Sequence, residues 1–101
     1  IANFEAATSE TDRGIWLATG TSNVNVTNNT ISNMVLTATA SSPIGINITT
    51  GVANSNVVVS QNNISGITSS GTVASMGIQV TGAIGGVTIS KNTITNIKNT
   101  N

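Results

Sequence analysis

The sequence of 101 residues predicts an all-β solenoid of about three stacked coils, each about 31 residues long with three short strands. Three patterns lead to this fold class: a Gly-apolar-any-apolar segment recurs, a short alternating segment follows each copy, and an Asn-any-Ile segment closes each unit. Ser, Thr and Asn make up nearly half of the residues, but Ile and Val recur between them at regular spacing, which favours an ordered chain. The density of Val, Ile, Thr, Asn and Gly disfavours helix.

The first strand of each unit begins with a glycine and carries apolar residues at alternate positions. Its copies are residues 14–17, 45–48 and 77–80, and their glycines are separated by 31 and 32 residues. Alternation at period two is typical of a strand with one buried face. The sequence therefore predicts that the apolar side chains of these strands point inward.

Two further strands complete each unit. The second strand is short, with Val or Ile at its first and third positions, in residues 24–26, 57–59 and 87–89. The third strand follows an asparagine and carries two Ile or Met residues three positions apart, in residues 29–34, 62–67 and 92–97. Residues 1–4 align with 94–97, so the sequence begins and ends at nearly the same phase of the repeat.

Stacking allows these units to bury their apolar faces, because a lone unit of three short strands cannot do so. In a stack, each strand pairs in parallel with its copy in the next coil, about 4.8 Å away. The inward columns are then Ile15/Ile46/Ile78, Leu17/Ile48/Val80, Val26/Val59/Ile89, Ile31/Ile64/Ile94 and Met34/Ile67/Ile97. We expect a single segment over residues 1–101, with coils at roughly 1–34, 35–67 and 68–101, that is part of a longer solenoid.

Other all-β arrangements fit the repeat less well. A propeller blade needs about 40 residues and four strands, whereas a leucine-rich repeat is shorter and dominated by Leu. An antiparallel sandwich stays open as an alternative, but it does not require similar residues to recur at corresponding phases. The recurrence favours stacked coils.

The succession Gly-Ile-x-Val, then Val-x-Ile, then Asn-x-Ile-x-x-Ile resembles the repeat of right-handed parallel β-helix proteins of the pectate-lyase-like superfamily. The resemblance covers essentially the whole chain, and it implies the right-handed parallel β-helix fold; the handedness comes from the family alone. The repeat occurs in pectate lyases and polygalacturonases, in phage tailspikes and in large bacterial surface proteins. The repeat therefore predicts the fold, whereas the function depends on which side chains the fold carries.

Three asparagines, Asn29, Asn62 and Asn92, occupy the same position before the third strand of each unit. We expect them to form a structural ladder in which side-chain amides hydrogen-bond from coil to coil. Asn also tolerates the left-handed backbone of a tight turn, which would suit this position. A row of polar ligand-binding groups is the functional alternative.

Trp16 is the candidate ligand-binding residue. It lies between two residues expected to point inward, Ile15 and Leu17, so alternation directs its side chain outward, where its counterparts are Asn47 and Gln79. An exposed indole can stack on the face of a sugar. Cover by long turns or by a neighbouring domain is the alternative for this side chain.

The acidic residues Glu5, Glu10 and Asp12 all lie near the start of the chain, and we expect them, with Arg13, mostly on the turn that leads into Gly14. Glycoside hydrolysis uses two opposed carboxylates, and a lyase needs a base that abstracts a proton. The later coils have no acidic residue and the sequence has no His, so a solvated turn is favoured and no catalytic residue is predicted. No metal-binding spacing is recognisable, and no metal or cofactor is expected.

The charge pattern restricts the partners. A formal net charge of zero offers no field that would attract nucleic acid, and no apolar run reaches the roughly 20 residues of a membrane-spanning helix. We therefore expect no nucleic-acid partner and no direct membrane insertion. The absence of Cys, together with the repeat, is common in large exported bacterial proteins, so an extracellular or cell-surface location is expected.

Two functions follow from these observations. The first is a structural or adhesive module of a secreted or cell-surface protein or filament, with no catalysis in this segment. Its partners would be further coils of the same protein or end-to-end copies of itself, because strand edges without a cap invite pairing. The alternative is a fragment of a carbohydrate-active protein, a polysaccharide lyase, glycoside hydrolase or carbohydrate-binding module, with polysaccharide as its partner.

Overall fold

The structure, a computed structural model, describes residues 1–6, 10–40, 42–82 and 84–101. These residues form ten strands: β1 Ala2–Ala6, β2 Thr11–Leu17, β3 Val24–Thr27, β4 Thr30–Leu36, β5 Ser42–Ile48, β6 Val57–Ser60, β7 Asn63–Ser69, β8 Met76–Val80, β9 Val87–Ser90 and β10 Thr93–Asn99. Within these ranges there is no helix of the length and apolar character that crossing a membrane requires.

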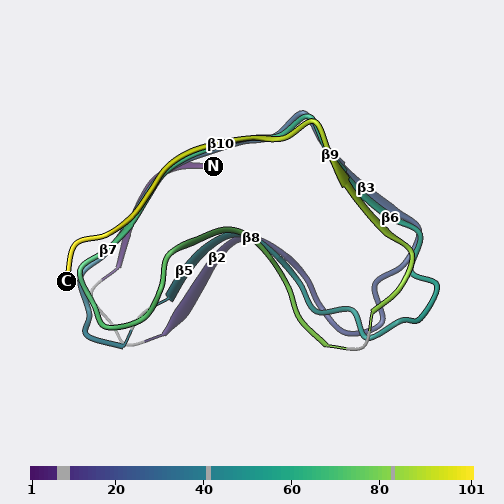
Figure 1. Ribbon diagram of the computed structural model, residues 1–101, viewed down its shortest axis with the longest axis horizontal. Helices are drawn as coiled ribbons and strands as arrows, with labels where there is room; N and C mark the ends of the chain where they lie inside the picture. Colours follow the sequence, from purple (N-terminus) through teal and green to yellow (C-terminus); the bar gives the residue numbers. More distant parts are fainter. Residues whose placement is uncertain (7–9, 41, 83) are drawn as a thin grey trace.

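The strands form three sheets, and every strand pair is parallel. The first sheet has the order β1-β4-β7-β10, the second β2-β5-β8 and the third β3-β6-β9. The chain visits the sheets in a fixed order, and its coils nearly superpose when viewed down the shortest axis (Figure 1). The predicted all-β class and the parallel pairing of corresponding strands are confirmed, and the arrangement is consistent with a parallel β-helix.

The core is an aliphatic interior between the three sheets. The predicted columns are in register; for example, Ile31 pairs with Ile64, which pairs with Ile94. The central member, Ile64, has no exposed surface, because a neighbour covers it on each side along the stack. Burial of a Val or Ile side chain stabilises a fold by about 1.5–3 kcal/mol, so each coil depends on the coils beside it.

A left-handed residue bends strands β4, β7 and β10 of the first sheet and sets the spacing of their apolar residues. Asn33 and Asn96 have φ angles of 57° and 55°, and Gly66 has a φ of 67°. This residue interrupts strict alternation, so Ile31 and Met34 both face the core although they are three positions apart. The bend explains why two residues separate the apolar positions in the pattern Asn-x-Ile-x-x-Ile. Asn and Gly are the residues that adopt this backbone most readily.

The second sheet bows inward toward the first sheet (Figure 1). Glycines lie at this closest approach, because a Cβ atom at Gly45 would lie 2.8 Å from Ile64 Cγ2 and 2.5 Å from the Gly77 carbonyl oxygen. A Cβ at Gly14 would similarly lie 2.7 Å from the Gly45 carbonyl oxygen. The recurring glycine of the first strand is therefore required by two close approaches, that of the carbonyl oxygen of the next coil in the same sheet and that of an Ile side chain from the first sheet.

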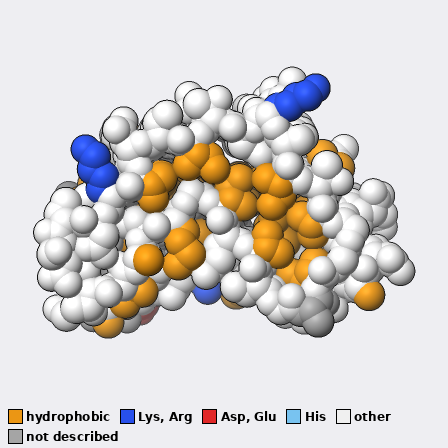
Figure 2. All heavy atoms as spheres, in the orientation of Figure 1, with side chains coloured by type: hydrophobic (Ala, Val, Ile, Leu, Met, Phe, Trp, Pro, Cys, Tyr) orange, Lys and Arg blue, Asp and Glu red, His pale blue; other side chains and the backbone are white. Residues whose placement is uncertain are grey.

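The two ends of the stack differ in exposure. Val80, Ile89 and Ile94, from the last coil, are each 44% exposed. Leu17 and Val26, which occupy two of the same columns in the first coil, are only 7% and 6% exposed. Figure 2 shows a band of hydrophobic side chains across the face that the last coil presents. This end carries the free edges of β8, β9 and β10.

Candidate functional site

The three ladder asparagines are joined by a continuous chain of hydrogen bonds that runs from one coil to the next. Asn62 is 1% exposed, and its Oδ1 accepts from the backbone N–H and from Nδ2 of Asn29, both at 3.0 Å. The backbone N–H and Nδ2 of Asn62 in turn donate to Asn92 Oδ1, both at 2.9 Å. Every bond between these asparagines runs from donor to acceptor in the same direction along the chain, so the ladder is polar.

Lateral bonds fix the amide planes of the ladder. Asn62 Nδ2 also donates to the Val26 carbonyl oxygen and Asn92 Nδ2 to the Val59 carbonyl oxygen, both at 2.9 Å. A buried amide must satisfy its donors and acceptor within the protein, because an unpaired buried polar group costs about 1–3 kcal/mol. Each amide is therefore held in one orientation.

The expectation that the ladder residues themselves occupy a left-handed turn is wrong. The left-handed residues are those immediately before them, Asn28, Gln61 and Lys91, with φ angles of 58°, 57° and 56°. This turn directs the following asparagine side chain along the stack, where it meets the next amide. Asn is thus needed at the ladder position for its side-chain bonds and not for its backbone preference.

Trp16 lies on the outer face of the second sheet and is 54% exposed. Its Nε1 donates to Thr49 Oγ1 at 2.8 Å, which ties the ring to the following coil. The guanidinium carbon of Arg13 lies 4.4 Å from the ring centroid, a cation–π geometry. The indole is therefore pre-oriented, with one side against Arg13 and the remainder open to solvent.

Unpaired polar atoms occur on the two strands beside this ring. Asn47, directly beside Trp16 in register, is 2% exposed and donates from Nδ2 to Gln79 Oε1 at 2.6 Å. Within the described part of the chain, the buried side-chain atoms without a hydrogen-bond partner are Asp12 Oδ2, Arg13 Nε and Asn47 Oδ1. All belong to strands β2 and β5. Asp12, Arg13, Trp16, Asn47 and Gln79 are together called the indole face below.

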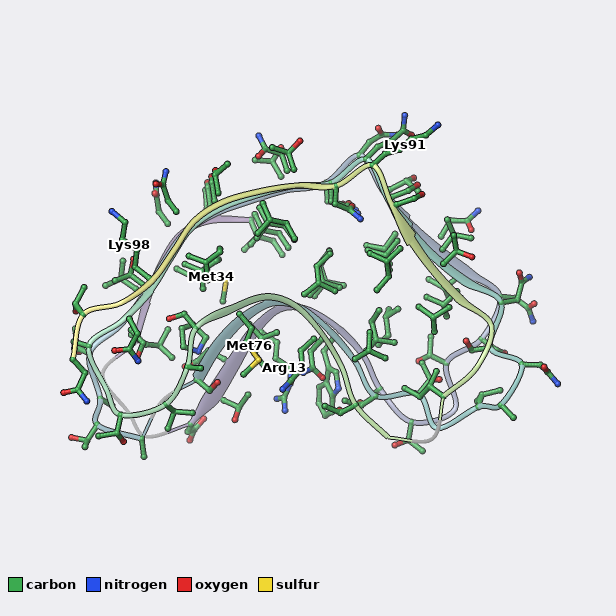
Figure 3. The ribbon with its side chains drawn as sticks, viewed as in Figure 1. Arg13, Met34, Met76, Lys91 and Lys98 are labelled. Carbon is green, nitrogen blue, oxygen red and sulfur yellow. The ribbon has the colours of Figure 1, made fainter. Side chains whose placement is uncertain are left out.

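The expectation that Asp12 and Arg13 lie on a turn is wrong, because both belong to β2. Strand β2 begins before the glycine since its partner β5 is long enough to pair there, with Asp12 opposite Pro43 and Arg13 opposite Ile44. Arg13 therefore lies on the hollowed outer side of the bowed second sheet (Figure 3), in the same register column as Ile44 and Met76. Glu10 precedes the strand and is exposed, and the side chain of Glu5 lies outside the described residues.

Sequence reasoning identified Trp16 but missed its partners. Thr49 is 33 residues away, and only the fold of one coil against the next brings it to the indole. Arg13, three residues before Trp16, was visible in the sequence, but it required a strand instead of a turn to lie beside the ring. The described side chains include no group of three or more His, Cys, Asp or Glu residues arranged to hold a metal ion.

Comparisons with protein-family models, with curated proteins and with solved structures find no match for this chain. Its own geometry and chemistry therefore carry the functional argument.

Proposed function

We propose that this chain is a structural or adhesive module of a secreted or cell-surface protein or filament, built as a right-handed parallel β-helix of the pectate-lyase-like kind. No catalysis takes place in this segment. The observation that carries the proposal is the uninterrupted, directional Asn ladder, which runs alongside three sheets that are in register from coil to coil. Such an arrangement is built to be extended along one axis.

The dimensions support a stacking role. The molecule measures 37 × 23 × 16 Å, and its coils stack along the shortest of these axes (Figure 1). The chain is therefore a thin slab whose stability resides in contacts between successive layers. Solenoids of this kind gain stability from each added layer, because interfaces between neighbouring repeats supply most of the folding free energy. A surface rod or filament uses this property directly.

The surface chemistry suits exposure outside the cell. The chain has six charged residues that cancel and no Cys, so neither strong fields nor disulfides take part in its assembly. Backbone pairing, aliphatic columns and the buried amide ladder supply its cohesion, and none of these depends on the redox state of the compartment.

Electron microscopy of the native material tests this proposal. We expect a long uniform rod or fibre whose cross-section matches 37 × 23 Å. Three coils alone would span only about 15 Å at about 4.8 Å per coil, so the two cases differ plainly in length. Short particles with attached domains would contradict the structural role.

The indole face favours carbohydrate binding as a second candidate function. An exposed indole that is held in place by Thr49 and Arg13 has a low entropic cost for stacking on a sugar ring. Titration of soluble polysaccharides, followed by Trp16 fluorescence and calorimetry, tests this candidate. Binding that is saturable and lost in Trp16→Ala, but kept in the matched surface variant Val35→Ala, would support it, whereas no heat with any polysaccharide would exclude it.

A further inference from the structure

We infer that the indole face binds N-acetylated amino sugars, in which Trp16 stacks on the sugar ring, Asn47 Oδ1 accepts from the acetamido N–H and Arg13 donates to the acetamido oxygen. The inference deepens the second candidate function, carbohydrate binding, and rests on it. An unpaired buried acceptor and an unpaired buried donor, which flank one indole ring, carry the inference.

The unpaired acceptor is the side-chain oxygen of Asn47. This residue belongs to β5, the central strand of the second sheet, which pairs with β2 on one side and β8 on the other. Its Oδ1 has no hydrogen-bond partner among the described residues, although the residue is only 2% exposed. Asn62 lies in the same coil and is 1% exposed, and its Oδ1 accepts two hydrogen bonds. The fold can therefore satisfy a buried amide oxygen in this coil, and at Asn47 it leaves the oxygen unpaired.

The amide of Asn47 is oriented with its oxygen toward Trp16. Its Nδ2 donates to Gln79 Oε1 at 2.6 Å, on the β8 side of the strand. Because nitrogen and oxygen lie on opposite edges of an amide, Oδ1 points to the β2 side, where Trp16 lies in register. An indole has a single N–H donor, and here it is committed to Thr49 Oγ1. Trp16 thus lies beside the oxygen without donating to it.

The unpaired donor belongs to Arg13. Its guanidinium lies over the indole, and its Nε is buried with no acceptor among the described residues. Nη1 donates to the Thr11 carbonyl oxygen at the long distance of 3.3 Å. A flexible Arg side chain held by these weak contacts can swing away from the sheet, while the bond to Thr49 keeps the indole in place. This movement uncovers one face of the ring and frees Nε to donate to a ligand that occupies that face.

A secondary amide matches this pair of groups. It carries one donor and one acceptor on opposite edges, so it can reach partners on two neighbouring strands at once. A carboxylate would place its oxygens against Asn47 Oδ1, which is also an acceptor, and an ammonium group has no acceptor for Arg13. A hydroxyl can donate and accept, but its one oxygen would have to lie within hydrogen-bond distance of both groups. The amide is therefore the favoured chemistry.

The acetamido group of an amino sugar combines this amide with a ring that fits the indole. Trp16 is 54% exposed and offers a flat apolar surface on which a pyranose can stack beside its own acetamido group. The bond to Thr49 has already restricted the indole, so stacking costs little further side-chain entropy. A peptide carries the same amide but no pyranose face. The ligand class is therefore a saccharide with N-acetylated residues.

Matched trisaccharides test the ligand class on the unmodified chain. The trimers of N-acetylglucosamine and of glucose, joined by the same linkage, differ in one substituent of each ring, an acetamido group or a hydroxyl. Calorimetry and the fluorescence of Trp16, the one Trp of the chain, measure the two affinities. We expect the acetylated trimer to bind about tenfold more tightly, a ratio that an additional hydrogen bond can supply. Trimers of glucosamine and of galacturonate should bind no more tightly than the glucose trimer.

Two asparagine variants test the acceptor. Asn47→Ala removes it, so the ratio between the two affinities should fall to about one, while binding of the glucose trimer persists through Trp16. Asn63→Ala makes the same change at an exposed residue of the first sheet and should keep the ratio of the unmodified chain. Circular dichroism checks that both variants are folded. The trisaccharide series on the unmodified chain decides the ligand class even if Asn47→Ala does not fold.

The outcomes separate this inference from the function on which it rests. Equal binding of the acetylated trimer and the glucose trimer would overturn the inference and leave carbohydrate binding standing. A tenfold ratio that persists in Asn47→Ala would overturn the assignment of the acceptor. Tighter binding of a blocked dipeptide amide than of the acetylated trimer would assign the face to peptides and overturn the sugar. Absence of binding to every saccharide would overturn both the inference and the second candidate function.

Discussion

Among alanine substitutions of the three ladder asparagines, Asn62→Ala should lower the free energy of unfolding the most. The change removes four side-chain hydrogen bonds: two accepted from Asn29 and one donated to each of Val26 and Asn92. It also leaves the partly buried backbone N–H of Asn29 without its acceptor. The substitution therefore interrupts the ladder on both sides.

The size of the effect follows from these losses. A net contribution of about 0.5–1.5 kcal/mol for each hydrogen bond, together with an unpaired, partly buried donor, gives a loss of about 3–5 kcal/mol in the free energy of unfolding. Domains of this size are stable by about 5–15 kcal/mol, so the variant should stay folded only near the lower limit of stability. The neighbouring exposed residue provides the control: Asn63→Ala should change the free energy of unfolding by less than about 0.5 kcal/mol.

Urea denaturation followed by far-ultraviolet circular dichroism measures both variants. The ends of the ladder extend the test, because Asn92→Ala removes three side-chain bonds and Asn29→Ala removes two. The expected order of destabilisation is therefore Asn62, then Asn92, then Asn29. A loss of less than 1 kcal/mol for Asn62→Ala, or equal losses at all three positions, would refute the reasoning that the ladder is a continuous stabilising element.

Three further predictions concern the glycine column, a left-handed turn and the bond that holds the indole. Gly45→Ala places a Cβ atom 2.5 Å from the Gly77 carbonyl oxygen, so thermal denaturation should show a loss of at least about 2 kcal/mol in the free energy of unfolding; an unchanged midpoint would mean that the neighbouring strand β8 and the facing Ile64 can move aside freely. Gln61→Gly relieves the strain of a left-handed backbone with a φ of 57°. Urea denaturation should therefore show a gain of about 0.5–1 kcal/mol in the free energy of unfolding, whereas a loss would contradict the strain argument. Thr49→Val removes the acceptor for Trp16 Nε1, so acrylamide should quench the indole fluorescence more strongly; identical quenching would show that the bond does not hold the ring.

Much of the fold could be predicted because a stacked repeat makes each sequence position equivalent to the position one coil later. Val26, Val59 and Ile89 recur at the same phase, and they are paired in register in the structure. The same equivalence located the three ladder asparagines, since in-register stacking brings identical side chains to within hydrogen-bond distance. The pattern is local in sequence, and parallel pairing converts it directly into a contact between coils.

The candidate site was less predictable, because it depends on where strands begin and how far apart the sheets lie. Arg13 was assigned to a turn, yet the length of β5 extends β2 past Gly14 and places the guanidinium on the indole. The glycine column was recognised as a repeat marker, but its cause, the inward bow of the second sheet, involves the facing residue Ile64. Neither feature is encoded in the spacing of residues along one strand.

The sequence alone therefore determined the all-β class, the coil length, the inward columns and the position of the Asn ladder, because periodicity and parallel stacking suffice for these. The tertiary structure decided which residues adopt left-handed backbone, how Trp16 is held by Thr49, and how close the second sheet comes to the first. The last two of these features depend on contacts between residues about one coil apart and between facing sheets. Such distances are set by side-chain packing in three dimensions, which residue order does not specify.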